Sequence, residues 1–338
     1  MERFQIQPER LDAASPVSSI SFTEVTHKKN RELLKKYIRY GLGITNLSVS
    51  VIRGEHSAIR NFLNDICQDE NEDVCSVTPA QMDDYFKKQR QRSVQAETYN
   101  KNVMCIQHFF NFLKVRQYIE RIPFDAECCL KKIIPRHLDR SVAQEAADEI
   151  LEKLCCFPET IRIMYLHLWG VGLRISEVCT LKGNAYYIQG KDAWIQVYQI
   201  KMRTYKRIPI PDALYKLTKV YLKKHGIKAD DYVFQNAKGG AYCKSTFRYN
   251  MLKYCELNNI QNGGYVFKSH DYRHTIATYF YDTGVSLQSI RDYLGHDYEE
   301  MTEQYIDYMP KKIEKASEEY FSRHSLAACM KRGEKTDG

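Results

Sequence analysis

The sequence contains no apolar run that approaches the roughly 20 residues a helix needs to cross a bilayer. Its N-terminus, MERFQIQPERLDAAS, carries acidic residues and has no apolar core of the kind found in secretory signals. A glycine-rich phosphate loop is also missing, because Lys238-Gly239-Gly240 lacks the surrounding pattern and indicates a turn. The first two absences favour a soluble protein, and we expect it in the cytoplasm.

The cysteines do not form a disulfide or metal framework. There are 11 of them, an odd number, without a CxxC pair. Cys128–Cys129 and Cys155–Cys156 are adjacent in sequence, and neighbouring cysteines seldom bond to each other. Reduced thiols in a reducing compartment are therefore the expected state.

Length and charge set only broad limits. The 338 residues are enough for two substantial hydrophobic cores, and 43% hydrophobic and 27% charged residues are ordinary for a globular protein. Lys and Arg outnumber Asp and Glu by 50 to 42, a net charge of +8. That excess is compatible with a nucleic-acid partner, but many proteins that bind no nucleic acid share it.

The N-terminal part of the chain has the periodicity of a small helical domain. Residues 1–24 contain two prolines and several serines, which predict an irregular arm. Thr78-Pro79-Ala80-Gln81 is a capping box with proline at the first helical position. We predict a helical DNA-binding domain over 25–116 and a linker over 117–140, with helices at about 24–40, 47–67, 78–91 and 96–115.

A second domain is predicted over residues 141–325, followed by a flexible tail over 326–338. Ser141-Val142-Ala143-Gln144 has the form of a capping box and predicts a helix through Leu154. Alternating residues over 194–210 predict a pair of antiparallel strands. The expected fold class is mainly α with a small antiparallel sheet, with further helices at 159–169, 211–224, 244–258, 272–282, 286–294, 300–306 and after Pro310.

Several residues that could carry chemistry have ordinary explanations when taken singly. Arg174, in GVGLRISEV, and Lys201, beside the predicted strand turn, could each be a solvated charge. His270 and Arg273, in SHDYRHT, fall within two helical turns, where core or surface roles are commoner. Tyr305 is one of 25 tyrosines. No member of this set predicts a function alone.

The order and spacing of these residues together resemble the tyrosine recombinases, the family of phage integrases and chromosome-dimer-resolving recombinases. GLRISE, a lysine on a β-hairpin, HxxR, LGH and a tyrosine nine residues later occur in that order. The resemblance spans residues 170–308, and the helices over 45–115 are similar to that family's core-binding domain. The matching segments are GVGLRISEVCTL (170–181), IKMRTYKRIPI (200–210), SHDYRHTIATYFYDTGVSLQSIRDYLGH (269–296) and TEQYIDY (302–308).

The resemblance implies a phosphate clamp. Arg174 and Arg273 would hold the two non-bridging oxygens of the scissile phosphate, since the guanidinium fork matches phosphate geometry. His296 would donate a further hydrogen bond to the same phosphate. Glu177, one helical turn after Arg174, would orient that arginine or a neighbouring base.

The resemblance also implies a nucleophile and a route for protons. Tyr305 would attack phosphorus, and its phenol, with a pKa near 10, must lose its proton as it attacks. Lys201 would protonate the leaving 5′-oxygen, a role that suits a desolvated lysine whose pKa is lowered by two arginines. His270 would assist proton transfer to or from Tyr305. The 3′-phosphotyrosyl intermediate conserves bond energy, so no metal, nucleotide or other cofactor is expected.

Other residues compete for two of these roles. Arg203, Lys206 and Arg207 lie near the same hairpin as Lys201, which we prefer because it precedes Pro209 by eight residues. Tyr298 and Tyr308 stand two and twelve residues after His296, spacings that fit the family less well than that of Tyr305.

Two other features of the HxxR segment bear on the site. His270 and His274 have the spacing of a helical zinc pair, but Arg273 between them would repel a cation, and we expect no metal site. Tyr272, at a position where the family commonly has leucine, is expected to pack inward.

The sequence thus predicts a DNA strand breaking and rejoining enzyme, an integrase or transposase of a mobile element. Double-stranded DNA would be its partner, with a homo-tetramer forming on synapsed sites. Two alternatives remain open: a type IB topoisomerase-like nicking-closing enzyme, and a catalytically silent DNA-binding protein of the same fold. Basic residues of the N-terminal domain are equally compatible with a solvated surface and with DNA contacts; the candidates for contact are Lys87, Lys88, Arg90 and Lys101.

Overall fold

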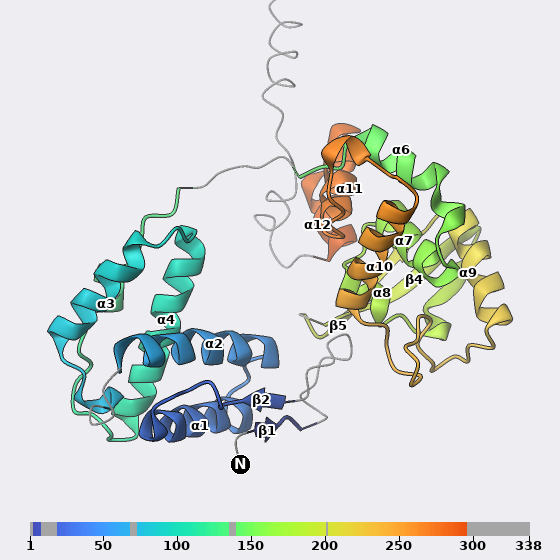
Figure 1. Cartoon of the computed structure of the whole chain (residues 1–338). Coiled ribbons are helices and arrows are strands. Elements are labelled where there is room, and N and C mark those ends of the chain that lie inside the picture. The colour runs from blue at the N-terminus through green and yellow to red at the C-terminus, as the bar shows by residue number, and fades with distance from the viewer. Residues whose placement is uncertain (1–2, 8–18, 68–72, 135–139, 201, 296–338) are drawn as a thin grey trace, which may run out of the picture. The chain divides into compact units, whose positions relative to one another are not determined.

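A computed structural model describes residues 3–7, 19–67, 73–134, 140–200 and 202–295. The chain divides into two compact units, unit 1 over residues 1–136 and unit 2 over residues 137–338 (Figure 1). The helices expected at 300–306 and after Pro310 lie outside the described residues. None of the described helices is long and apolar enough to cross a membrane.

Unit 1 is built mainly from helices. They are α1 (Lys28–Gly43), α2 (Val49–Ile66), α3 (Pro79–Gln91), α4 (Ala96–Val115) and the short α5 (Ala126–Cys129), with a 3₁₀ turn at Val74–Ser76. Helix α2 packs against α1, α3 and α4. Each long helix buries one apolar stripe, and this pattern is the one from which α2 and α4 were predicted. Phe62 of α2 and Phe109 and Phe110 of α4 are fully buried in this core.

The first residues of unit 1 differ from the irregular arm that we expected. Strands β1 (Arg3–Gln5) and β2 (Ser19–Ser21) pair antiparallel. Ile20 and Phe22 are buried against the helical core, and the rings of Phe22 and His56 lie perpendicular to each other. The sequence did not predict these strands, because each has three residues and only one of them is apolar, with a polar residue on either side.

Most of the expected linker belongs to unit 1. Residues 119–130 include α5 and place Ile119, Phe124 and Ala126 against the core of the bundle. Tyr99 donates a hydrogen bond to the Cys129 carbonyl (3.1 Å), and the Asn100 side chain bonds both the N–H and the carbonyl of Lys131. These contacts secure the segment up to Lys131 on α4.

The two predicted capping boxes have different outcomes. At α3, the Thr78 hydroxyl accepts from the Gln81 N–H and the Gln81 side chain accepts from the Thr78 N–H, which confirms the first box. The second box is wrong, because α6 (Gln144–Glu152) begins three residues after Ser141 and has Ala143 at its N-cap. Ser141 and Val142 instead bond the hydroxyls of Thr278 and Thr275.

Unit 2 is organised around α7 (Glu159–Val171). This helix packs against the short α8 (Ile175–Cys179), α9 (Asp212–Lys224), α10 (Lys244–Leu257) and α11 (Asp271–Asp282). Its buried residues are spread around its circumference, as expected of a central helix. Helix α12 (Leu287–Leu294) packs on α11, and 3₁₀ turns lie at Leu154–Cys156, Gly183–Ala185 and Asn262–Gly264.

The sheet of unit 2 has one strand more than the predicted pair. Strands β3 (Tyr186–Gln189), β4 (Asp192–Gln199) and β5 (Thr204–Pro209) run antiparallel in the order β3-β4-β5. Strand β3 was missed because its outer half is exposed and carries no clear alternation. The β4–β5 pair is confirmed, with Gln199 opposite Thr204 and Val197 opposite Lys206. This register decides which hairpin side chains face the interior.

A buried histidine gives unit 2 a predicted sensitivity to acid. His167 of α7 is fully buried between the Ile163 carbonyl, 2.7 Å from Nδ1, and the Tyr186 hydroxyl, 2.8 Å from Nε2. Burial lowers the pKa of His167 to about 4. The unfolded chain therefore binds more protons between pH 6.5 and 4, so the stability from neutral His167 is lost as pH falls through that range.

We expect this loss to approach about 3 kcal/mol at pH 4. The measurement is urea unfolding of the full chain at several pH values, followed by tryptophan fluorescence, since Trp169 and Trp194 are the chain's two tryptophans and both lie in unit 2. His167→Gln should show a flatter pH dependence between 6.5 and 4. Identical profiles for the two proteins would contradict the assignment.

Candidate active site

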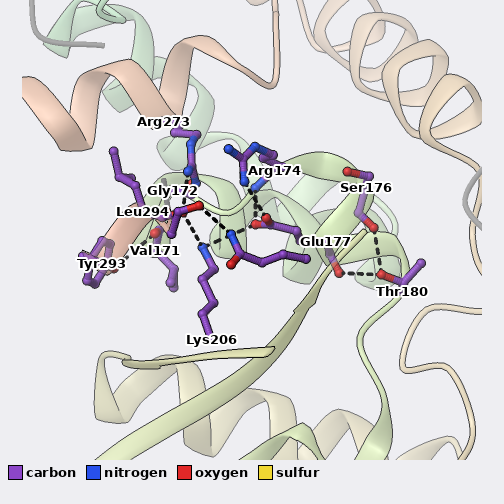
Figure 2. Close-up of polar contacts among 12 residues, drawn as sticks. Val171, Gly172, Arg174, Ser176, Glu177, Thr180, Lys206, Arg273, Tyr293 and Leu294 are labelled. Carbon is purple, nitrogen blue, oxygen red and sulfur yellow. Dashed lines mark hydrogen bonds and ion pairs between the residues drawn. The ribbon is translucent and has the colours of Figure 1, made fainter. Parts of the chain in front are cut away.

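Arg174 is fixed at the N-terminus of α8 by Glu177. One oxygen of the Glu177 carboxylate accepts from the Arg174 backbone N–H (2.9 Å), and the other accepts from guanidinium Nη1 (2.9 Å). The left-handed conformation of Gly172 (φ 66°) ends α7 two residues earlier and allows the tight turn into α8. Glu177 thus holds both the backbone and the side chain of Arg174 (Figure 2).

Lys206 lies on the other side of the same carboxylate. Its Nζ is 3.5 Å from Glu177 Oε2 and donates to the Leu294 carbonyl at 3.2 Å (Figure 2). Burial lowers the pKa of Lys206 to about 8, and the charges of Arg273 and Arg174 act in the same direction, against Glu177. Burial alone would raise the pKa of Glu177, but Lys206, Arg273 and Arg174 outweigh it and lower that pKa. The Glu177 carboxylate therefore interacts electrostatically with all three of these positively charged side chains.

Arg273 is the largest fully buried side chain among the described residues of unit 2. It belongs to α11, and its guanidinium donates to the Gly172 carbonyl (3.1 Å) and the Leu294 carbonyl (2.5 Å). It therefore links the end of α7 to the end of α12, as Figure 2 shows. A buried guanidinium requires such acceptors, because it remains charged.

His270 completes the described part of the cluster from the N-cap of α11. Although His270 is exposed, the protein atoms around it, the neighbouring His274 and the positive charges of Arg273 and Arg174 lower its pKa to about 4. At neutral pH the imidazole is therefore uncharged and can accept a hydrogen bond. Its ring contacts the buried His274 edge to face (5.2 Å between centroids). Tyr272 is buried against Tyr165, so its predicted inward packing is confirmed.

The structure thus gathers Arg174, Glu177, His270 and Arg273 at one place. Lys201, His296 and Tyr305 lie outside the described residues. Met202 and Arg203, which follow Lys201, complete the turn between β4 and β5, where both backbone N–H groups donate to the Gln199 carbonyl.

Two residues of this cluster were not predicted for it: Gln199 was not considered, and Lys206 was weighed only as a competitor of Lys201 for the role of proton donor. Gln199 is buried at the end of β4 and donates to the Gly295 carbonyl at 2.8 Å. A usable signal was present, because Lys206 alternates with the apolar Ile208 along β5 and Gln199 alternates with Val197 along β4. Period-two spacing places each of them on the buried face.

The four candidate DNA-binding residues of unit 1 have unequal surroundings. All four are exposed, on α3 and α4. Lys87 pairs with Asp84 at 3.5 Å. Arg90 donates to the carbonyls of Cys128 and Cys129, so it also fastens α5. The Lys101 ammonium lies beside Gly54 of α2.

Comparison with known proteins places the chain in a family. The model of the phage integrase family matches residues 140–312, more than half of the chain. Transposase B of transposon Tn554 from Staphylococcus aureus is 28% identical over 306 residues, 85% of this chain and 47% of that protein. Tyrosine recombinase XerC of Bacillus pumilus is 23% identical over 313 residues, 88% of this chain and 97% of that protein.

A solved structure supports the fold. The XerH site-specific recombinase bound to a palindromic difH substrate has a TM-score of 0.63 at 15% identity, covering 88% of this chain and 91% of that chain. The mainly helical fold class with a small antiparallel sheet, predicted from the sequence, is therefore confirmed.

The protein belongs to the phage integrase family, the tyrosine recombinases. The chain spans about half the length of the transposase B relatives that it matches.

Proposed function

We propose that this protein is a site-specific DNA recombinase that cuts and rejoins strands through a 3′-phosphotyrosyl intermediate, as the integrase or transposase of a mobile element. The observation that carries the proposal is the cluster in which Glu177 fixes Arg174 beside the buried Arg273. This arrangement holds fixed positive charge, with Arg174 in front of the buried Arg273, in a chain of the phage integrase family, whose chemistry requires such charge at a phosphodiester.

The proposed chemistry begins at phosphorus. The oxygen of Tyr305 forms a bond to the scissile phosphorus, and the bond from phosphorus to the 5′-oxygen breaks. Arg174 and Arg273 neutralise the charge that builds on the non-bridging oxygens, assisted by His296. Arg273 is fully buried on the Gly172 and Leu294 carbonyls, so a direct bond to a phosphate oxygen requires it to leave one of them. The reverse attack by a 5′-hydroxyl restores the phosphodiester and releases Tyr305, so no external energy source is needed.

Two proton transfers accompany the cleavage step. Lys201 gives a proton to the departing 5′-oxygen, and the phenol of Tyr305 loses one. His270 is a suitable acceptor in a relay, because its lowered pKa keeps the imidazole neutral at pH 7. An incoming phosphate anion would offset the arginine charges that contribute to this lowering, and would make His270 more basic in the complex.

The test of this function is covalent capture of DNA. The full chain is incubated with randomised duplexes, each nicked so that a short fragment diffuses away after cleavage, and the mixture is then denatured. We expect DNA that remains attached to protein and that yields a consensus sequence. DNA that binds before denaturation but is never retained afterwards would indicate a catalytically silent binding protein.

A second arm of that experiment distinguishes recombination from topoisomerase activity. Supercoiled plasmid without the captured consensus is expected to remain supercoiled, and two copies of the consensus should exchange strands. Efficient relaxation of the plasmid without strand exchange would favour a nicking-closing enzyme.

We further propose that four protomers assemble on two DNA sites. The expected observation is a tetramer-sized complex in mass photometry of the protein on its consensus duplex. Residues after about 312, outside the described part of the chain, are the candidates for contact between protomers. Their deletion should reduce the tetramer and leave binding of single protomers intact; undiminished synapsis would contradict this role.

DNA affinity provides another prediction. Lys87 and Lys88 are neighbouring exposed cations of α3. If both contact phosphates, the double variant Lys87→Ala, Lys88→Ala should reduce the slope of log affinity against log salt by roughly 1 to 2, because each phosphate contact that is lost releases about one counterion fewer when the DNA binds. Lys223→Ala, at the exposed end of α9, is the control that should leave the slope unchanged. An unaltered slope in the double variant would assign these lysines to a solvated surface.

A further inference from the structure

Three side chains converge on the last carbonyls of α12. Arg273 Nη2 and Lys206 Nζ donate to the Leu294 carbonyl at 2.5 and 3.2 Å, and Gln199 Nε2 donates to the Gly295 carbonyl at 2.8 Å. Carbonyls at a helix C-terminus have no partner within their own helix, so they are available to such donors. The donors come from α11, β5 and β4, so three separate elements hold this helix end.

Two of these donors share one face of the β4–β5 hairpin. Gln199 is 4% exposed and Lys206 is 8% exposed, and the register places Lys206 opposite Val197 on the inner face. Tyr198 and Tyr205, opposite each other on the outer face, are exposed. The inner face of the hairpin is therefore fastened to α12 close to the turn.

Two features favour glycine at position 295. A Cβ on Gly295 would collide with the amide of Gln199, and Gly295 has a φ of 67°, in the left-handed region. Glycine meets both demands, since it has no Cβ and adopts positive φ without cost. The residue that ends α12 is thus adapted to the hairpin as well as to its own turn.

A buried lysine ammonium costs more free energy than a neutral donor would, so stability alone does not explain why Lys206 holds this carbonyl. Burial of an ammonium group is costly unless it is paired, and here two arginines repel it while one carboxylate attracts it. Its ammonium already contacts Glu177 and the Leu294 carbonyl. It is therefore placed to act through other residues, and a direct contact with substrate would require it to leave both partners.

The residues in these contacts are close in sequence to two of the proposed catalytic residues. Lys201 follows Gln199 by two residues, and His296 directly follows Gly295. We propose that Gln199 and Lys206 are positioning residues, which lock the hairpin that carries Lys201 onto the helix end that precedes His296. This inference rests on the proposed function, because the contacts of Gln199 and Lys206 would align the proton donor Lys201 with the phosphate.

The test compares two leaving groups on the captured consensus duplex. One substrate is the ordinary phosphodiester, and the other has sulfur in place of the bridging 5′-oxygen. A thiolate departs without protonation, so the sulfur substrate does not need an aligned proton donor. Gln199→Leu and Lys206→Met are compared with Lys201→Ala, which removes the proposed acid, and with Lys223→Ala as the control.

We expect Gln199→Leu and Lys206→Met to cleave the oxygen substrate about 10- to 100-fold more slowly than wild type, less than the roughly 10²- to 10⁴-fold worth of a general acid. On the sulfur substrate both should return to within about threefold of wild type, as should Lys201→Ala. Lys206→Arg, which keeps a charged donor for the Leu294 carbonyl, should recover most of the rate on the oxygen substrate. Lys223→Ala should match wild type on both.

Equal losses on the two substrates, or no loss on either, would overturn the proposal. If Lys206→Met does not fold, Gln199→Leu decides the question, because it removes a neutral donor and leaves no buried charge. Failure of the proposed function itself has a different signature, since wild type would then form no covalent adduct with either substrate.

Discussion

Arg174→Ala is expected to slow DNA cleavage by roughly 10²- to 10³-fold, the usual cost of removing one donor from a transition-state oxyanion. Arg174 is aimed by two bonds to Glu177, so its guanidinium is oriented before DNA arrives. Preorganisation is what makes such a donor effective, since no reorientation is needed when the charge develops. DNA affinity should change little, because many other phosphate contacts contribute to it.

The measurement is the single-turnover rate of adduct formation on the captured consensus duplex. Arg174→Lys retains the charge without the planar fork, and we expect a rate between those of Arg174→Ala and wild type. Lys223→Ala controls for the loss of one positive charge from unit 2. A rate for Arg174→Ala within about threefold of wild type, far from the expected loss, would remove Arg174 from the site.

Glu177→Gln is expected to destabilise unit 2 by about 3–5 kcal/mol, the range observed when one partner of a buried ion pair is removed. The amide can still accept from the Arg174 backbone N–H, so helix capping is largely retained. What disappears is the negative charge that faces Lys206, Arg174 and Arg273. Those cations would remain buried without their shared carboxylate.

The pH dependence of this loss identifies its cause. Glu177 raises the pKa of Lys206, so the variant should lose the Lys206 proton more readily than wild type, in which the pKa is about 8. Once Lys206 is neutral, less charge remains uncompensated. The destabilisation should therefore be larger at pH 6 than at pH 9, as measured by urea unfolding with tryptophan fluorescence. A loss that is equal at both values, or absent, would contradict the electrostatic account.

Periodicity predicted most helices of both units, and family resemblance predicted the described site residues. The predictions failed where tertiary contacts outweighed local pattern. Ser141 has the spacing of an N-cap, but its hydroxyl bonds Thr278 of α11 and the helix begins later. Strands β1 and β2 are too short for a pattern to emerge, and burial of Ile20 and Phe22 against helices distant in sequence stabilises them.

The candidate site shows the same division. Arg174 and Glu177 are neighbours on one helix turn, so their contact follows from local geometry. The position of Lys206 depends on a hairpin register and on the end of α12, which is 88 residues away in sequence. The spacing of neighbouring residues does not predict a contact between segments so far apart in sequence. The alternation of β5 indicated that Lys206 faces inward, but it did not indicate that Lys206 would contact Glu177.

The most direct test of the account is to identify the amino acid that becomes attached to DNA. The trapped adduct is digested with nuclease and protease, and the peptide that carries the phosphate is sequenced by mass spectrometry. We predict a phosphate on Tyr305, with Tyr305→Phe binding the consensus duplex but forming no adduct and Tyr308→Phe forming it normally. A phosphate on Tyr298, Tyr308 or any other side chain, or an adduct that persists in Tyr305→Phe, would contradict the account.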